Sequence, residues 1–209
     1  MNFLICIDQS LALTLPVEIK HDFPCHHLAL PSSLEPEDYY SCTLDWMNQH
    51  KAGDQYNIAI LLGRAWPLSE NELPNCLFFL PDDINGLMYQ PLCRTFDSEG
   101  GVRFTGVSQL FNPGLKDGVE QFMKRRKMDC STGIAAAIPH PWLLSPAEKE
   151  VLRKMGAEIA VDRLYLNARA ARACGIPAVG LTAVAESGGQ LQQIVLYLLE
   201  YLIKNKSHN

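Results

Sequence analysis

The chain has 209 residues, of which 47% are hydrophobic and 20% charged, a composition typical of a globular protein with a full apolar core. Its formal net charge is −5, from 18 lysines and arginines against 23 aspartates and glutamates, so nothing indicates a nucleic-acid partner. The one dense basic run, Lys124 to Lys127, is predicted to be the solvated end of a helix. No apolar stretch approaches the roughly 20 residues of a membrane-spanning helix, so no membrane partner is expected.

The cysteines and the N-terminus favour a cytoplasmic protein without a bound metal. The 7 cysteines are odd in number and form no CxxC pair, which argues against a disulfide framework and a zinc ribbon. Cys25, His26 and His27 are consecutive, and adjacent side chains rarely reach one ion, so we expect neither a metal nor another cofactor. The N-terminal apolar run lacks a preceding basic region and meets Asp8 too early for a signal peptide.

The first half of the chain alternates short apolar runs with segments rich in turn residues. Uniformly apolar runs predict strands that are buried on both faces, and clusters of Asp, Gly and Pro predict loops. In chain order, the pattern predicts a strand over 3–7, a helix over 40–50, strands over 57–62 and 76–80, a long loop over 81–101 and a strand over 102–110.

The second half carries sharper helix signals. Ser145 is a predicted N-cap, Pro146 occupies the first helical position, and Glu148 completes a capping box. Apolar residues recur at helical spacing over 191–203. In chain order, the pattern predicts a helix over 119–128, a strand over 133–138, a helix over 145–155, a strand over 158–161, a helix over 164–174, a strand over 178–185 and a helix over 191–203.

This alternation predicts one α/β domain over residues 1–209, with a central twisted mixed sheet flanked by helices. Ligands of such folds bind at the carboxyl ends of the strands. The loops that follow Ile7, Leu62, Leu80 and Val184 are therefore the places where we expect a site. His140, which lies between two prolines after another predicted strand, is predicted to be a turn residue.

Residues 160–189, AVDRLYLNARAARACGIPAVGLTAVAESGG, resemble the purine nucleoside phosphorylase and methylthioadenosine nucleosidase superfamily. In that family a strand leads into a Met-Glu pair, followed by a helix, Gly-Ile-Pro, a strand and Arg-x-x-Ser-Asp, and the order and lengths match here. A weaker likeness covers residues 57–84, where the family has a strand, a G-x-A-G turn and another strand.

The resemblance implies a nucleoside phosphorylase-like fold and cleavage of the ribosyl N-glycosidic bond of a purine-type nucleoside, by phosphate or by water. The transition state of that reaction resembles an oxocarbenium ion, so a carboxylic acid near the purine protonates the leaving base. A carboxylate below the ribose holds its hydroxyls, and backbone donors of the Gly-rich turn bind phosphate in the phosphorylases. A small nucleoside-like ligand is therefore the implied partner, and a homo-oligomer is left open.

Two motifs of the family are altered in this chain. Its Met-Glu pair falls on Asp162 and Arg163, and Asp162 either presents its carboxylate to the sugar or caps the next helix beside a solvated Arg163. The family's Arg-x-x-Ser-Asp places Thr182, Ala185 and Glu186 at its polar positions. Glu186 is the candidate general acid, displaced by about one methylene, and its alternative role is to cap or line a loop.

The Gly-rich turn is altered as well. It becomes Gly63-Arg64-Ala65-Trp66, where Trp66 either plugs the phosphate site or walls off a base pocket by stacking, and Arg64 is a candidate anion contact. The alternative is that both residues are structural. Asp8, at the end of the first strand, is a candidate to act on water, or else it caps its loop.

Two functional hypotheses follow. The first is an N-ribosyl hydrolase, favoured over a phosphorylase, that relies on Glu186 and Asp8 for catalysis and on residues 162–163 for the sugar. The second is a family member that has lost catalysis and binds a nucleoside-like ligand or a protein partner. The fold alone does not decide between them, because function depends on the site.

Overall fold

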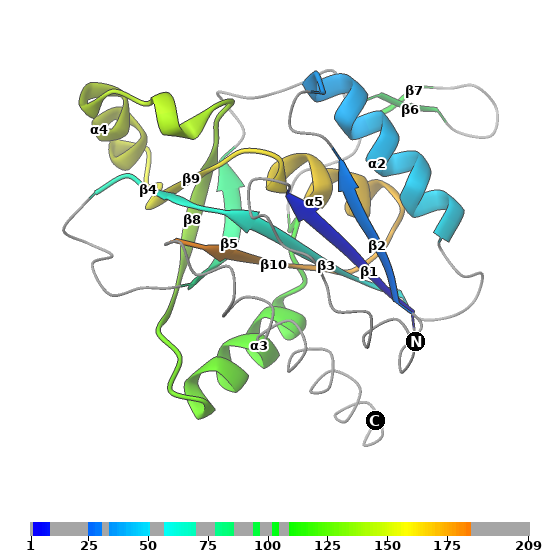
Figure 1. Cartoon of the computed structure of the whole chain (residues 1–209), viewed down its shortest axis with the longest axis horizontal. Coiled ribbons are helices and arrows are strands. Elements are labelled where there is room, and N and C mark those ends of the chain that lie inside the picture. The colour runs from blue at the N-terminus through cyan, green and yellow to red at the C-terminus, as the bar shows by residue number, and fades with distance from the viewer. Residues whose placement is uncertain are drawn as a thin grey trace.

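The fold is a mixed sheet with helices on both faces, as predicted (Figure 1). The computed structural model describes residues 2–8, 25–30, 34–50, 57–69, 78–85, 94–96, 102–104 and 109–184. The helix predicted over 191–203 lies outside these residues. No helix within them is both long enough and apolar enough to span a membrane.

The elements alternate along the chain in the predicted manner. The strands are β1 (Asn2–Asp8), β2 (Cys25–Leu30), β3 (Asn57–Arg64), β4 (Trp66–Pro67), β5 (Phe78–Asn85), β6 (Arg94–Phe96), β7 (Val102–Phe104), β8 (Cys130–Ala137), β9 (Ile159–Val161) and β10 (Ala178–Ala183). The helices are α2 (Pro36–His50), α3 (Pro113–Arg125), the short 3-10 helix η2 (Pro141–Leu143), α4 (Pro146–Lys154) and α5 (Leu164–Ala173).

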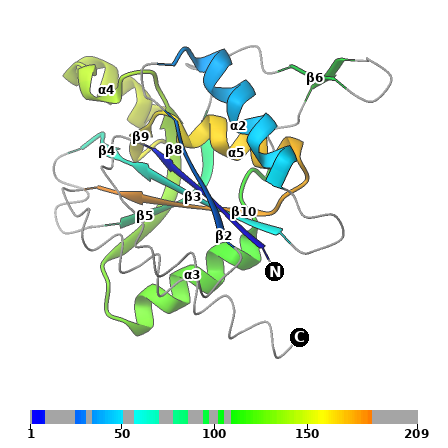
Figure 2. The same ribbon diagram turned by 45° about the vertical axis from the view of Figure 1, so that its right-hand side comes forward.

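The main sheet has eight strands in the order β2-β1-β3-β10-β5-β8-β9-β4, with β6 and β7 forming a separate hairpin pair. Strands β2, β1, β3 and β10 are parallel, and β10 meets β5 antiparallel before the parallel set β5, β8 and β9. Only Ala65 separates β3 from β4, yet β3 pairs with β10 while β4 pairs with β9. The sheet therefore curls, and one continuous stretch of chain touches both of its halves (Figure 2).

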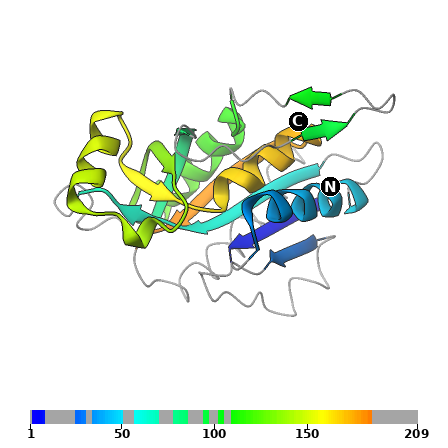
Figure 3. The same cartoon turned by 90° about the horizontal axis from the view of Figure 1, so that it is seen from above.

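Helices α2 and α5 cover one face of the sheet, α3 covers the other, and α4 lies near β9 and β4 at one end (Figures 1 and 3). Helix α5 is rich in alanine, and the fully buried Ala168, Ala170 and Ala171 let its backbone approach its neighbours closely. On the α2 side, Thr43 is completely buried and donates its hydroxyl to the carbonyl of Tyr39. This apolar layer supports the strand ends described below.

Helix α4 begins as predicted. Ser145 is the N-cap, its Oγ accepts a hydrogen bond from the amide of Glu148 at 3.3 Å, and Oε2 of Glu148 accepts from the amide of Ser145 at 2.8 Å. The helix ends before Gly156, whose φ of 87° requires the left-handed conformation that glycine adopts most easily. The basic run 124–127 is exposed at the end of α3, which confirms that prediction.

Strands β4 and β6 and the 3-10 helix η2 were not predicted, and α2 begins at Pro36 rather than at residue 40. Residues 109 and 110, predicted to end a strand, are not in one. Three further differences have a local reason. Strand β2 was not predicted, because its two histidines interrupt the apolar pattern of this parallel edge strand. Strand β5 runs through Pro81 to Asn85, where a loop was predicted, because a bulge between Pro81 and Asp83 accommodates the proline. Helix α3 begins at Pro113 rather than 119, because Asn112 caps it by accepting a hydrogen bond from the amide of Leu115, and proline is suited to the first turn.

We predict that Gly180→Ala destabilises the protein by about 1–3 kcal/mol, because it overpacks the core. A Cβ at Gly180 would lie 2.8 Å from Cε1 of Phe111 and 3.2 Å from Cγ of Pro81, and the ring of Phe111 is buried. Urea denaturation followed by circular dichroism measures the loss. Gly114→Ala in the exposed first turn of α3 is the control, and it should be neutral or stabilising. Equal stabilities for Gly180→Ala and wild type would contradict the prediction.

Candidate functional site

The ends of three strands meet at Ala65. The amide of Ala65 donates to the carbonyl of Ala183, the last residue of β10, at 2.8 Å. The neighbouring Trp66 pairs with Ala160 of β9, so the carboxyl end of β9 also reaches this point. Because ligands of α/β folds bind at strand ends, the junction around Ala65 is the candidate site.

One group of side chains at this junction is aromatic and cationic. The guanidinium carbon of Arg64 lies 5.5 Å from the ring centroid of Trp66, and the ring of Trp66 lies 5.6 Å from that of Trp142 at an interplanar angle of 48°. His140 meets Trp142 edge-on, with ring centroids 5.1 Å apart. We call Arg64, Trp66, His140 and Trp142 the aromatic cluster. The indole of Trp142 is 51% exposed, so the cluster offers an aromatic surface to a ligand.

The cluster arises from two segments that the sheet brings together. Arg64 and Trp66 are two residues apart along β3 and β4, which directs them to the same face. His140 is the N-cap residue of η2 with a left-handed φ of 54°, and this turn follows directly after β8. His140 is thus a turn residue, as predicted, but its contact with Trp142 was not predicted. The only sequence signal for Trp142 is an aromatic residue that closely follows a strand and a Pro-His-Pro turn.

Asp162 and Arg163 form a second group at the end of β9. Both are buried, with exposed fractions of 7% and 5%, and Nε of Arg163 lies 3.7 Å from Oδ2 of Asp162. Arg163 also donates from Nη2 to the carbonyl of Leu34 at 2.7 Å, and its guanidinium carbon lies 4.9 Å from the ring centroid of Tyr39. The arginine thereby ties the start of α5 to α2.

Two predictions about this pair are wrong. Arg163 is not solvated, because its guanidinium is stacked on Tyr39 of α2 and hydrogen-bonded to the carbonyl of Leu34, just before that helix. Asp162 is not the cap of α5, because the N-cap position falls on Arg163, which makes no side-chain hydrogen bond to the first turn. Helix α5 itself begins at Leu164, as predicted, so only the position of its N-cap differs.

Thr182 and Gly63 are paired neighbours on β10 and β3. Thr182 is fully buried, and its hydroxyl donates to the carbonyl of Phe79 at 3.0 Å, so this hydroxyl braces the junction of β10 and β5. A Cβ at Gly63 would make ordinary contacts of 3.6 Å with Leu164 and 3.7 Å with Thr182. The space next to Gly63 is therefore bordered by the first residue of α5.

The two predicted catalytic carboxylates are placed only in part. Asp8 is the last residue of β1, and the preceding Ile7 pairs with Leu62, so its backbone lies at the same sheet edge as Gly63. Glu186 lies outside the described residues, two positions after Val184, which follows β10 at the junction. The structure thus brings the backbone of Asp8, the aromatic cluster and the end of β10 to one edge of the sheet.

The strand order and the antiparallel step between β10 and β5 define a curled, mixed α/β sheet whose candidate site lies at the strand ends. Among solved structures, a mutant adenosine/methylthioadenosine phosphorylase from Schistosoma mansoni in complex with adenine has a TM-score of 0.75 at 14% identity, with 97% of this chain and 90% of that chain covered. The purine nucleoside phosphorylase from the same organism, in complex with acetate, has a TM-score of 0.70 at 14% identity, with 95% and 89% covered.

Curated proteins give a weaker match to the same family. Purine nucleoside phosphorylase 1 of Geobacillus stearothermophilus is 25% identical over 135 residues, and that of Bacillus subtilis is 23% identical over 111 residues. These matches cover 64% and 53% of this chain but only 49% and 41% of the relatives, so the chain spans less than half of their length. No family model matches the chain. The predicted resemblance is confirmed, and the chain is a divergent protein with the nucleoside phosphorylase-like fold.

Proposed function

We propose that this protein is a cytoplasmic enzyme that cleaves the ribosyl N-glycosidic bond of a purine-type nucleoside, with water rather than phosphate as the acceptor. The observation that carries the proposal is the aromatic cluster at the strand ends of a nucleoside phosphorylase-like fold. One solved structure of similar fold holds adenine, and another holds tubercidin, so related folds accept purine-like rings. We assign the base-binding surface of this chain to Trp142 and its neighbours.

A planar base suits this surface. Trp142 is half exposed while Trp66 packs behind it, so the cluster combines a free aromatic face with a fixed support. Stacking of a purine on such a face contributes about 1–3 kcal/mol per base. Arg64 adds a cation close to the ring of Trp66, where it attracts the electron-rich parts of a ligand.

The chemistry that we assign needs two carboxyl groups. Glu186 follows the end of β10 and is our general acid, which protonates the departing purine as the glycosidic bond breaks. Asp8 ends β1 at the same sheet edge and is our base, which takes a proton from the water that attacks the anomeric carbon. The oxygen of that water becomes the hydroxyl on the anomeric carbon of the sugar, and the purine leaves with the proton that Glu186 donates.

Water is favoured over phosphate because of residue 66. The family's final glycine of the turn lets an anion approach the backbone, whereas here the position carries the half-buried indole of Trp66 beneath the guanidinium of Arg64. The indole occupies volume that a phosphate needs, and it carries no positive charge and only one N–H donor for the phosphate oxygens. Arg64 is the one member of the aromatic cluster that bears a permanent positive charge.

We predict that release of the base does not depend on phosphate. Wild-type protein is incubated with a panel of purine nucleosides in phosphate-free buffer and in buffer with added phosphate, and free base is measured by chromatography. Equal rates in the two buffers are expected, together with free ribose as the sugar product. A clear phosphate dependence with ribose 1-phosphate as product would overturn the hydrolytic assignment, and it would make Arg64 the phosphate ligand.

A second candidate function is binding without catalysis. It is favoured by the ion pair between Asp162 and Arg163 and by the hydrogen bond from Thr182 to the carbonyl of Phe79. At three of the family's site positions, the polar groups therefore bind other parts of the protein. In this case one nucleoside of the panel raises the melting temperature while none is cleaved. Cleavage of any nucleoside by the purified protein excludes this candidate.

A further inference from the structure

Helix α4 exposes an apolar stripe that the proposed function does not use. Ala147, Val151 and Met155 follow one another at spacings of four residues, which places them on one side of the helix and its C-cap. Val151 is 54% exposed and Met155 36% exposed, while Leu143 of the adjacent η2 is 72% exposed. We call Leu143, Ala147, Val151 and Met155 the α4 face. Apolar side chains that are exposed together mark interaction sites more often than isolated ones do.

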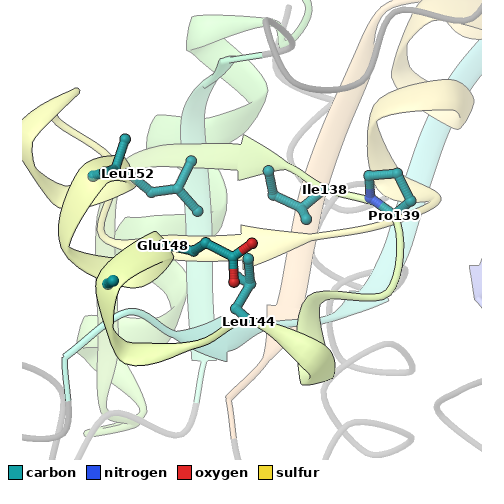
Figure 4. Close-up of a pocket in the computed structure, with 7 residues that line it drawn as sticks. Ile138, Pro139, Leu144, Glu148 and Leu152 are labelled. Carbon is teal, nitrogen blue, oxygen red and sulfur yellow. The ribbon is translucent and has the colours of Figure 1, made fainter.

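A cavity of about 300 Å³ opens beside this stripe. Ala147 and Val151 line it from α4, together with Leu152, and Ile138 and Leu144 line it from the end of β8 and from the turn after η2 (Figure 4). Its walls are apolar apart from Glu148.

The carboxylate of Glu148 belongs to the capping box. The hydroxyl and amide of Ser145 donate to it and hold the pKa of that carboxyl below its usual value. The cavity therefore offers mainly an apolar surface to an incoming side chain.

The charges that flank the stripe have a two-fold pattern. Glu150 and Lys154 lie on the same flank of α4, one turn apart, with their carboxylate and ammonium groups 3.7 Å apart. When two such helices pack antiparallel, Glu150 of each faces the region of Lys154 on the other. At 100° per residue, Lys149 lies about 160° around the helix from Ala147 and equally far from Val151. Its charge therefore does not enter this contact.

We propose that the α4 face binds the α4 face of a second copy of this chain, with the two helices antiparallel about a two-fold axis near Val151. Residue sizes match in this arrangement, because the small Ala147 lies opposite the partner's Met155. Since Ala147 lines the cavity, the flexible methionine enters it and fills apolar space. The contact is isologous, so each copy supplies both the cavity and the side chain that fills it.

The extent of α4 sets the strength of this dimer. The helix has 9 residues, about 13 Å in length, so with η2 it forms an interface at the small end of specific contacts. We therefore expect a dimer that dissociates on dilution rather than an obligate one. Leu152 is buried below α4 and lines the cavity that the methionine of the second copy fills.

Sedimentation velocity over a concentration series of the full chain tests the proposal. Wild type should shift from monomer to dimer as concentration rises, and Val151→Glu should weaken dimerisation at least tenfold, because it places two carboxylates at the two-fold axis. The matched control is Ile134→Glu, which changes a residue of 39% exposure on β8, outside the α4 face. It should leave the dimer intact, and circular dichroism verifies that both variants fold.

Charge reversal gives a second, independent test. Glu150→Lys and Lys154→Glu should each weaken the dimer, and the double variant should restore it, because the charges are exchanged between copies. A monomer at every concentration would overturn the proposal. So would a dimer that is indifferent to Val151→Glu, or a double variant that is weaker than both single ones.

Discussion

Arg163→Ala is expected to destabilise the protein by about 3 kcal/mol, because it removes one partner of a buried ion pair. Arg163 is 5% exposed and lies 3.7 Å from the carboxylate of Asp162, which is itself buried. The substitution also deletes the hydrogen bond to the carbonyl of Leu34 and the stacking on Tyr39 that ties α5 to α2. Urea denaturation at neutral pH measures the loss.

Two comparisons make this result specific. Arg153→Ala removes an exposed ion pair with Glu150 on α4 and should cost less than about 0.5 kcal/mol. Arg163→Met combined with Asp162→Leu should regain much of the lost stability, because neither charge of the pair then remains buried. A stable Arg163→Ala variant with impaired nucleoside binding would instead return residue 163 to a role in sugar recognition.

The fold was largely predictable because its strands are apolar on both faces. The run from 57 to 62 and the alternation with helices sufficed to place a sheet covered on two sides, and the capping box at Ser145 fixed the start of α4. Strand β2 was not predicted, because Cys25, His26 and His27 interrupt the apolar pattern, although the strand pairs with β1 in parallel register. Local patterns describe what is buried, whereas the order of strands depends on long-range pairing.

The candidate site was predictable only in part. Residues 63–66 and 162–163 were placed by the family's motifs, but the sequence gives no measure of whether their side chains face a ligand or each other. Arg163 contacts Tyr39 of α2, a helix that precedes it by over a hundred residues, so no local pattern reports that contact. Trp142 meets Trp66 across the end of the sheet for the same reason. The curl of the sheet at Ala65 accounts for the position of Trp66, because it takes β4 away from β3 and places it beside β9.

The largest catalytic effect is expected at Glu186. As the proposed general acid, it must hold a proton near neutral pH and give it to the leaving purine, so Glu186→Gln should lower the rate of base release by about a hundredfold to ten-thousandfold. The amide of glutamine retains the size of the side chain and nearly all of its binding contacts, but it has no acidic proton to donate. Ligand affinity, followed as a shift in melting temperature, should therefore stay close to that of wild type.

The measurement is release of adenine or hypoxanthine from a nucleoside panel, with Glu120→Gln on the far helix α3 as a matched loss of one carboxylate. Glu120→Gln should keep the wild-type rate, and matched circular dichroism spectra exclude misfolding as a cause of lost activity.

A full rate in Glu186→Gln would remove this residue from catalysis. An inert wild type that a nucleoside nevertheless stabilises against heat would establish the binding function, and then Glu186→Gln would act on the melting shift alone. If no nucleoside is cleaved or bound, the substrate class of the family does not extend to this chain, whose altered residues at positions 66, 163 and 182 are the physical reason.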